Sequence, residues 1–196
     1  MQKRLLLLGA GLIAALTLAA VASAVGANGL RNGDFETGSL SSWTTFTTAN
    51  GTINGGDVQS FDTTGTGASL AAHFDVGEVL YSGAPEGGGI YQNFSGAPYS
   101  VSADVAAQAA AGHPSNGDCG TFVLQLDGTT IASHAFGPCS GSSISRWHFF
   151  VHISNGVFGN HQLRILIERV FTTSPPSSTP NQYVDNVRVD LKISKV

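Results

Sequence analysis

Charge is scarce in this sequence, because only 11% of its 196 residues are Asp, Glu, Lys or Arg. Helical proteins are rich in Glu, Lys, Leu and Arg, and this chain is poor in them, which argues against a mainly helical fold. Its 25 glycines and many serines and threonines instead separate short runs of β-branched and aromatic residues. This pattern predicts an all-β sandwich or barrel, and the apolar alternation within the runs argues against disorder.

Long apolar runs are also rare, and residues 5–21 form the one that stands out. This run follows a short basic start and precedes Ala22-Ser23-Ala24, a small-x-small cleavage pattern, so residues 1–24 are predicted to be a secretory signal peptide. Cleavage after Ala27 is the alternative. The remaining residues 25–196 suit one domain. We therefore expect a secreted or extracellular protein, with a periplasmic or cell-surface location also open, and no membrane span.

Positive charge is in short supply as well. Without Lys3 and Arg4 of the signal peptide, the nine basic residues become seven, against 13 acidic ones, for a formal net charge of −6. Nucleic-acid phosphates and anionic membrane surfaces attract basic proteins. Neither is therefore expected as a partner.

The apolar runs predict eight to ten short strands at the regular spacing of a sandwich. The expected strands are residues 44–48, 68–74, 90–94, 99–107, 121–127, 130–136, 146–153, 161–171 and 183–191. Residues 49–56 and 75–89 are rich in glycine and turn-forming residues, so we expect them to form turns and a surface loop. No internal repeat of fixed period is visible.

Two patches near the ends of the predicted domain resemble a known family. Asn32-Gly-Asp-Phe-Glu36, followed by Gly38-Ser-Leu-Ser-Ser-Trp43, resembles the opening of secreted carbohydrate-binding modules of the CenC-like group. Tyr183-Val-Asp-Asn-Val187 resembles their closing strand, and residues 90–103 resemble their mid-chain strand pair. The resemblance implies a jelly-roll β-sandwich of the galactose-binding-domain-like fold, which would bind a polysaccharide or another glycan.

The same resemblance implies a structural calcium ion, because the opening loop and the closing strand of the family lie side by side and often share one. Glu36 and Asp185 would supply side-chain oxygens, and Asp34 a carbonyl or side-chain oxygen. Carbonyls of residues 65–69 would complete an all-oxygen set, which calcium prefers. The alternative is that residues 32–34 form only a turn, which Asp185 caps through hydrogen bonds.

Aromatic rings are the usual platforms for sugars, because a flat ring stacks on the apolar face of a pyranose. Tyr81 and Tyr91 are the candidates for an exposed platform, and Gln92 is a candidate hydrogen-bonding neighbour. Strand alternation places Tyr91 and Gln92 on opposite faces, so at most one of them can line a given face. The resemblance implies that Trp43 and Trp147 pack in the core.

No catalytic motif stands out. The chain lacks a Gly-x-Ser-x-Gly elbow. A glycosidase needs two carboxylates across the scissile bond, whereas Glu78 and Glu86 fall in the expected loop and Glu168 in a strand. We therefore expect a non-catalytic protein. The alternative is a structural or adhesive protein that assembles with itself or another extracellular protein, which an exposed apolar edge strand would favour. A polysaccharide-active enzyme comes third.

Cysteine is limited to Cys119 and Cys139, and export permits a disulfide between them. The two positions average to 129, in the Asp127-Gly128-Thr129 turn of the clearest predicted hairpin. Opposed residues of an antiparallel hairpin have a constant index sum, so the two cysteines are predicted to face each other at its open end. Their Cα atoms would then lie roughly 4.5–5.5 Å apart, a distance that a disulfide bridges.

Overall fold

The computed structural model describes residues 27–113, 115–172 and 179–193, so the predicted signal peptide lies outside it. Within these residues the chain forms β-strands and no helix, and nothing there is long and apolar enough to cross a bilayer as a helix. The strands are β1 (Thr44–Thr47), β2 (Gly51–Phe61), β3 (Ser69–Glu78), β4 (Glu86–Gly96), β5 (Pro98–Gln108), β6 (Ser115–Asn116), β7 (Thr121–Leu126), β8 (Thr129–Ala135), β9 (Cys139–Ser140), β10 (Ile144–His152), β11 (Gly159–Arg169) and β12 (Asn181–Leu191).

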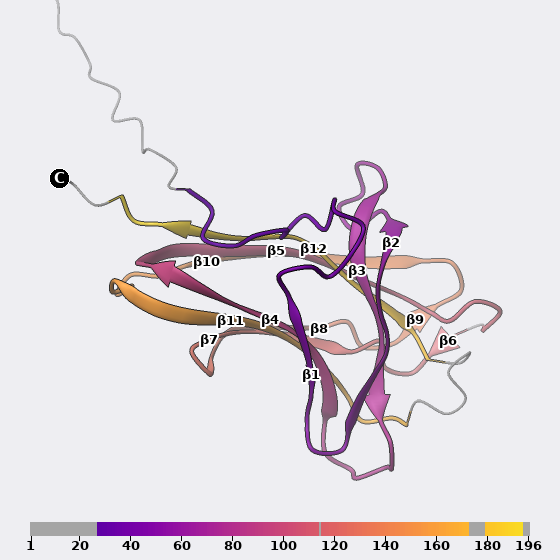
Figure 1. The fold of residues 1–196 in the computed structure, drawn as a ribbon. Coiled ribbons are helices and arrows are strands. Elements are labelled where there is room, and N and C mark those ends of the chain that lie inside the picture. Colours follow the sequence, from indigo (N-terminus) through magenta and orange to yellow (C-terminus); the bar gives the residue numbers. More distant parts are fainter. Residues whose placement is uncertain (1–26, 114, 173–178, 194–196) are drawn as a thin grey trace, which may run out of the picture.

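Two five-stranded antiparallel sheets pack face to face (Figure 1). The first sheet has the strand order β1-β4-β11-β7-β8, and the second has the order β10-β5-β12-β3-β2. Strands β6 and β9 form a separate two-stranded sheet. This architecture confirms the predicted single-domain jelly-roll β-sandwich.

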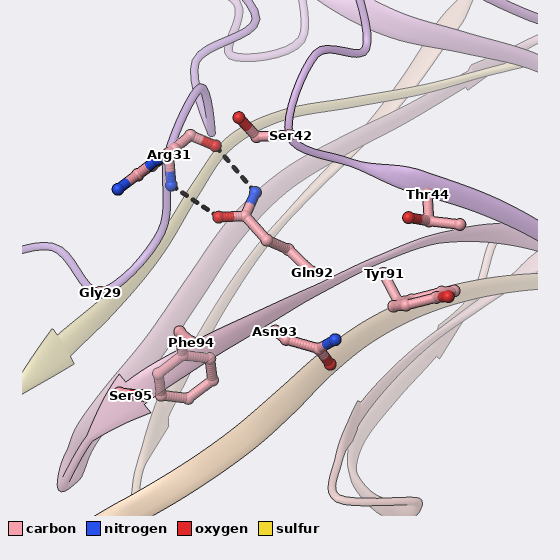
Figure 2. A pocket seen from close by; sticks show the side chains of 9 residues that line it. All are labelled: Gly29, Arg31, Ser42, Thr44, Tyr91, Gln92, Asn93, Phe94 and Ser95. Carbon is pink, nitrogen blue, oxygen red and sulfur yellow. Dashed lines mark hydrogen bonds between the residues drawn. The ribbon is translucent and has the colours of Figure 1, made fainter.

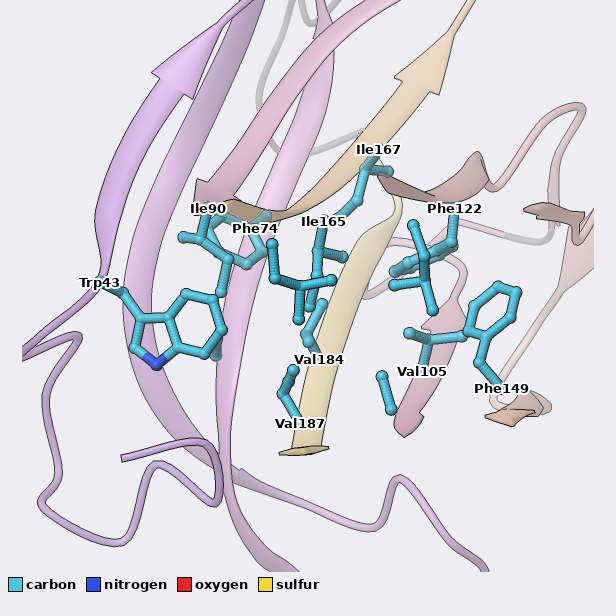
Figure 3. Packing of buried hydrophobic residues seen from close by; sticks show 14 of the residues in the cluster. Trp43, Phe74, Ile90, Val105, Phe122, Phe149, Ile165, Ile167, Val184 and Val187 are labelled. Atoms are coloured by element: carbon cyan, nitrogen blue, oxygen red, sulfur yellow. The ribbon is translucent and has the colours of Figure 1, made fainter. Parts of the chain in front are cut away.

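The core lies between the two sheets and is built by alternate residues of their strands (Figure 3). Val105 of β5 and Ile165 of β11, for example, are completely buried. Each such side chain contributes roughly 1.5–3 kcal/mol through removal of apolar surface from water. Trp43 closes one end of the core at 7% exposure, and its indole Nε1 donates to the Asn32 carbonyl at 2.9 Å, which confirms its predicted packing.

Trp147 was expected in the core, and this prediction is wrong. Its side chain is 45% exposed, and its indole stacks on the ring of His134, with centroids 4.0 Å apart and planes 4° from parallel. The reason is its position on β10, which is an edge strand of the second sheet, as β8 is of the first. An inward-pointing ring at this edge has no further strand to cover it.

Two glycine-rich segments were expected to be turns or loop, and both are largely strand. Residues 51–61 form β2, and the expected loop 75–89 shrinks to residues 79–85 between β3 and β4. Glycine belongs in these strands because the backbones approach closely. A Cβ on Gly89, for instance, would lie 2.0 Å from the Ile165 carbonyl oxygen. The composition that indicates loops elsewhere indicates tight strand packing here.

The predicted disulfide between Cys119 and Cys139 is present, with Cα atoms 5.9 Å apart. The hairpin register that was expected to align them is wrong, because Cys119 lies opposite Gly137, whose carbonyl accepts a 2.7 Å hydrogen bond from the Cys119 amide. Cys139 lies beyond the end of the hairpin and pairs with Asn116 in the small sheet. The disulfide therefore ties the small sheet to the base of the hairpin.

Candidate functional site

The outer face of the first sheet carries side chains that converge on a candidate site. Directly opposed residues of antiparallel strands point to the same side of a sheet, so the register identifies which side chains share this face. One row across it consists of Thr44, Tyr91, Arg164 and Gln125, and the adjacent row consists of Phe46, Gly89, Leu166 and Val123. The residues between them, such as Ile90 and Ile165, point into the core and are fully buried.

Two aromatic rings lie together on this outer face. The rings of Phe46 and Tyr91 have centroids 6.2 Å apart and are tilted by 51°. The guanidinium of Arg164 lies over the Phe46 ring, 4.0 Å from its centroid, in a cation–π contact. Gly89 lies between β1 and β11 and has no side chain, which leaves room for Arg164 to reach across β4 to Phe46.

Amide and hydroxyl groups border the aromatic rings. The Gln162 side-chain amide donates to Asn93 Oδ1 at 3.0 Å, and the Ser95 hydroxyl donates to Asn160 Oδ1 at 2.5 Å. Side-chain amides carry both donors and acceptors, as sugar hydroxyls do. This part of the face can therefore exchange hydrogen bonds with a hydroxyl-rich ligand in either direction.

A groove of about 570 Å³ adjoins Tyr91 at the edge of the sheet (Figure 2). The groove is lined by Gly29, Arg31, Ser42, Thr44, Tyr91, Gln92, Asn93, Phe94 and Ser95. The buried Gln92 side chain bonds the Arg31 backbone twice, accepting from its amide at 2.7 Å and donating to its carbonyl at 2.9 Å. These two bonds hold the N-terminal segment beside β4, next to the position where β1 begins at Thr44.

The structure separates Tyr81 from Tyr91. Tyr81 is 72% exposed in the loop between β3 and β4, next to the exposed Val79 and Leu80. Tyr91 lies five residues beyond Glu86, where β4 begins, or roughly 17 Å along the strand. Tyr91 therefore shares a face with other candidate ligand-binding groups, whereas Tyr81 does not line the groove.

The predicted calcium ligands lie near the start of β3. Asp185 is fully buried, and its Oδ2 accepts hydrogen bonds from the hydroxyls of Thr63 at 3.1 Å and Ser69 at 2.6 Å. Burial raises the pKa of the Asp185 carboxyl. Glu36 Oε1 accepts from the amide of Leu70 at 3.1 Å, so Glu36 and Asp185 bond to successive residues of the chain.

Asp34 is exposed and lines a different groove, together with Asn186 and Val187. Among the described residues, no three His, Cys, Asp or Glu side chains are grouped as a metal site would need. The oxygens that the structure brings together are those of the Asp185 carboxylate and of the Thr63 and Ser69 hydroxyls, and oxygen ligands of these kinds suit a hard cation such as calcium. Calcium binding by Asp34, Glu36 and Asp185 stays a prediction.

A cluster of polar side chains around His73 occupies the outer face of the second sheet. His73 is 7% exposed, with Nδ1 2.8 Å from Asp57 Oδ1 and Nε2 2.9 Å from Asn181 Oδ1. Burial opposes its protonation, but hydrogen bonds to Asp75, Asn181 and Asp57 outweigh that effect and raise the pKa of His73 to about 9. The cluster holds a buried positive charge at neutral pH.

Sequence reasoning missed Phe46, Arg164 and Gln162 as members of the site. The alternation of residues 160–168 was visible, since Asn, Gln and Arg alternate there with Leu and Ile. It indicates a strand with one polar face. Which other strands lie beside that face depends on the sheet order, which the sequence does not reveal.

The comparisons with known proteins identify the fold. No family model matches the chain, and no curated protein matches it in sequence. Solved carbohydrate-binding modules do match in structure. One, studied for the promiscuous specificity of modules of the β-sandwich superfamily, has 12% identity and a TM-score of 0.50 over 85% of this chain and 63% of that chain.

Two further solved modules match. TmCBM61, in complex with β-1,4-galactotriose, has 13% identity and a TM-score of 0.49 over 85% of this chain and 100% of that chain. TmCBM27, which recognises mannan, has 12% identity and a TM-score of 0.48 over 79% and 91% of the two chains. At these identities the similarity concerns the fold.

Proposed function

We propose that the protein is an exported, non-catalytic carbohydrate-binding module that binds a polysaccharide or another glycan on the outer face of its first sheet. The observation that carries this proposal is the half-buried Tyr91, which lies with Phe46 on an open face bordered by side-chain amides. The β-sandwich fold, shared with solved carbohydrate-binding modules, supports it.

The chemistry of the face suits a sugar ring. Tyr91 offers a flat surface for the C–H groups of a pyranose, and the Asn93–Gln162 pair offers donors and acceptors for its hydroxyls. The sheet holds these groups in fixed positions, so that a ligand does not have to order them. We include in the proposal a structural calcium ion at Glu36 and Asp185 and cleavage of residues 1–24 during export.

The experiment is retention on insoluble polysaccharides together with a glycan array, using residues 25–196 and two variants. Tyr91→Ala should lose binding, because it removes the stacking surface from the face. Tyr81→Ala is the matched control, since it removes a more exposed tyrosine that lies outside the groove. Melting temperatures of all three proteins establish that they are folded.

Two results would contradict the proposal. Folded wild-type protein that is retained by no glycan would remove the function altogether. Retention that survives Tyr91→Ala but is lost in Tyr81→Ala would move the site to the loop between β3 and β4.

Assembly is the second candidate, and strand β10 favours it. β10 is a nine-residue edge strand without proline or lysine, and it exposes Trp147 and Phe150, the latter at 66%. Exposed apolar edge strands are templates for pairing with another chain, here a second copy. Analytical ultracentrifugation should show a dimer that Phe150→Lys dissociates. A monomer at every concentration would exclude self-assembly.

A further inference from the structure

The arginine and lysine side chains of the described residues differ in whether their charged groups bond to oxygen atoms. Four of the six are engaged by oxygen atoms, and these are Arg146 with Asp62, Arg188 with Asp190, Arg169 with the carbonyls of Asp118 and Val76, and Lys192 with the carbonyl of Gly156. The guanidinium groups of Arg31 and Arg164 make no hydrogen bond and no ion pair with any described residue.

These two arginines lie on either side of Tyr91. Arg164 is directly opposite Tyr91 in the register of β11 and β4 and therefore shares its face. Arg31 lines the groove that Tyr91 also lines (Figure 2). Arg164 thus lies at the proposed glycan-binding surface, and Arg31 lies at the adjoining groove with its side chain directed away from Tyr91 (Figure 2).

Arg164 is also held in place before any ligand arrives. The central carbon of its guanidinium lies 4.0 Å from the centroid of the Phe46 ring. Its Nε is buried and has no hydrogen-bond partner. An incoming anion cannot reach the buried Nε, so it would accept from the terminal nitrogens of the guanidinium, which make no hydrogen bond with a described residue.

We infer that the glycan is anionic, and that Arg164, assisted by Arg31, binds a carboxylate or sulfate group on it. The inference rests on the proposed function and specifies its ligand class. Guanidinium presents a planar fork of donors that matches such oxyanions and forms charge-assisted hydrogen bonds with them. A uronic acid and a sulfate ester supply the same chemistry, and experiment distinguishes them.

The charges elsewhere on the protein do not attract an anionic ligand, so its recognition depends on direct contact. The exported chain has a formal net charge of −6, so its overall field repels an anionic polymer. Glu168 lies on the same face, four residues along β11 from Arg164, or roughly 13 Å away. Selectivity must therefore come from contact with the two arginines, and binding must weaken at high salt.

The test compares anionic oligosaccharides with neutral counterparts of the same backbone. Oligogalacturonate is measured against its methyl ester, and a sulfated galactan oligomer against its desulfated form, by calorimetric titration. Wild-type protein should bind one of the anionic forms about tenfold or more tightly than its neutral counterpart. The pair that shows the difference identifies carboxylate or sulfate as the bound group.

Variants then assign the effect to the arginines. Arg164→Gln should remove most of the preference for the anionic form, measured as the ratio of the affinities for the anionic and the neutral oligosaccharide. Arg31→Gln should reduce the preference by a smaller factor. Arg188→Gln is the matched control, because it removes one positive charge from the other sheet, and it should leave the preference unchanged.

Two outcomes separate this inference from the proposed function. If neutral glycans are bound as tightly as anionic ones, or if a glycan array shows only neutral ligands, the inference is overturned and glycan binding stands. If no glycan of either class is bound, the proposed function itself fails. A preference that persists in Arg164→Gln also overturns the assignment.

Discussion

The outer faces of the two sheets differ in how far their polar groups already have hydrogen-bonding partners and their aromatic rings are already stacked. On the second sheet, Phe61 stacks on Tyr183 with ring centroids 3.6 Å apart, and the loop after β2 reaches Arg146, which bonds Asp62 at 3.0 Å. His73 lies between two aspartates on that face. On the first sheet, the polar ends of Tyr91 and Arg164 have no hydrogen-bonding partner among the described residues.

The difference shows how one sandwich divides its two outer surfaces. Buried groups that bond one another, as around His73 on the second sheet, stabilise the fold and have little left to offer a ligand. Groups held in position but not bonded, as on the first sheet, contribute less to stability and remain available. Substitutions on the two faces should therefore have opposite profiles.

The largest expected effect comes from a pair of tyrosines. Tyr183 is 6% exposed and stacked on Phe61, so Tyr183→Ala should lower the free energy of unfolding by about 3–5 kcal/mol. Tyr91→Ala, on the open face, should cost about 1 kcal/mol or less. Urea denaturation of both variants measures the difference. Equal losses would show that the two faces are not distinguished by packing.

Removing the disulfide should lower the free energy of unfolding somewhat less, by about 3 kcal/mol in the chain-entropy account. The variant replaces both Cys119 and Cys139 with alanine, because a single replacement leaves a free thiol. Chemical denaturation reports the loss, and glycan binding should persist, since the disulfide lies at the base of the β7–β8 hairpin and not at Tyr91. Loss of binding in a folded variant would connect the two regions.

The pH dependence of stability tests the closed face. The pKa of His73 is about 9 in the folded protein and near 6.5 in the unfolded chain, so its protonated form stabilises the fold below pH 6.5. This contribution is lost as the pH rises from 6.5 to 9, and the free energy of unfolding should fall by roughly 1–3 kcal/mol across that window.

His73→Gln provides the comparison for the pH series. Burial also opposes protonation of His161, but its hydrogen bond to Asp127 raises the pKa of that group, so it titrates in the same direction. The difference between the free energies of unfolding of wild type and variant therefore reports the titration of His73 alone. A wild-type curve parallel to that of His73→Gln would contradict a protonated His73.

Calcium should have a smaller, concentration-dependent effect. An ion held by Glu36 and Asp185 binds the folded chain only, so added calcium should raise the melting temperature and a chelator should lower it. Glu36→Gln should abolish the difference while leaving Asp185 with its two hydroxyl donors. If neither addition changes the melting temperature, the hydrogen bonds from Thr63, Ser69 and the Asn186 amide account for Asp185 without an ion.

The sequence was sufficient for the fold class and for local features. Alternation and turn residues predicted most strands. The family resemblance predicted Trp43 in the core, and the presence of only two cysteines in an exported chain predicted their pairing. The glycine-rich β2 escaped prediction, because its strand character comes from pairing with β3 along ten positions and not from its own residues.

The candidate site was only partly predictable, because it depends on the order of strands. Tyr91 could be named from its own segment, but Phe46 and Arg164 join it only because β1 and β11 flank β4. Trp147 was expected in the core from the resemblance, which does not report that its strand lies at the edge of the sheet. Sequence pattern reports which side a residue faces, and the topology reports what covers that side.

The central claim is that the outer face of the first sheet binds the glycan. The most direct test is an NMR titration of isotope-labelled protein with an oligosaccharide retained in the binding assay. The account predicts chemical-shift changes concentrated at Tyr91, Asn93, Gln162 and Arg164, with the residues around His73 unmoved. Changes confined to the second sheet, or to the loop that contains Tyr81, would contradict it.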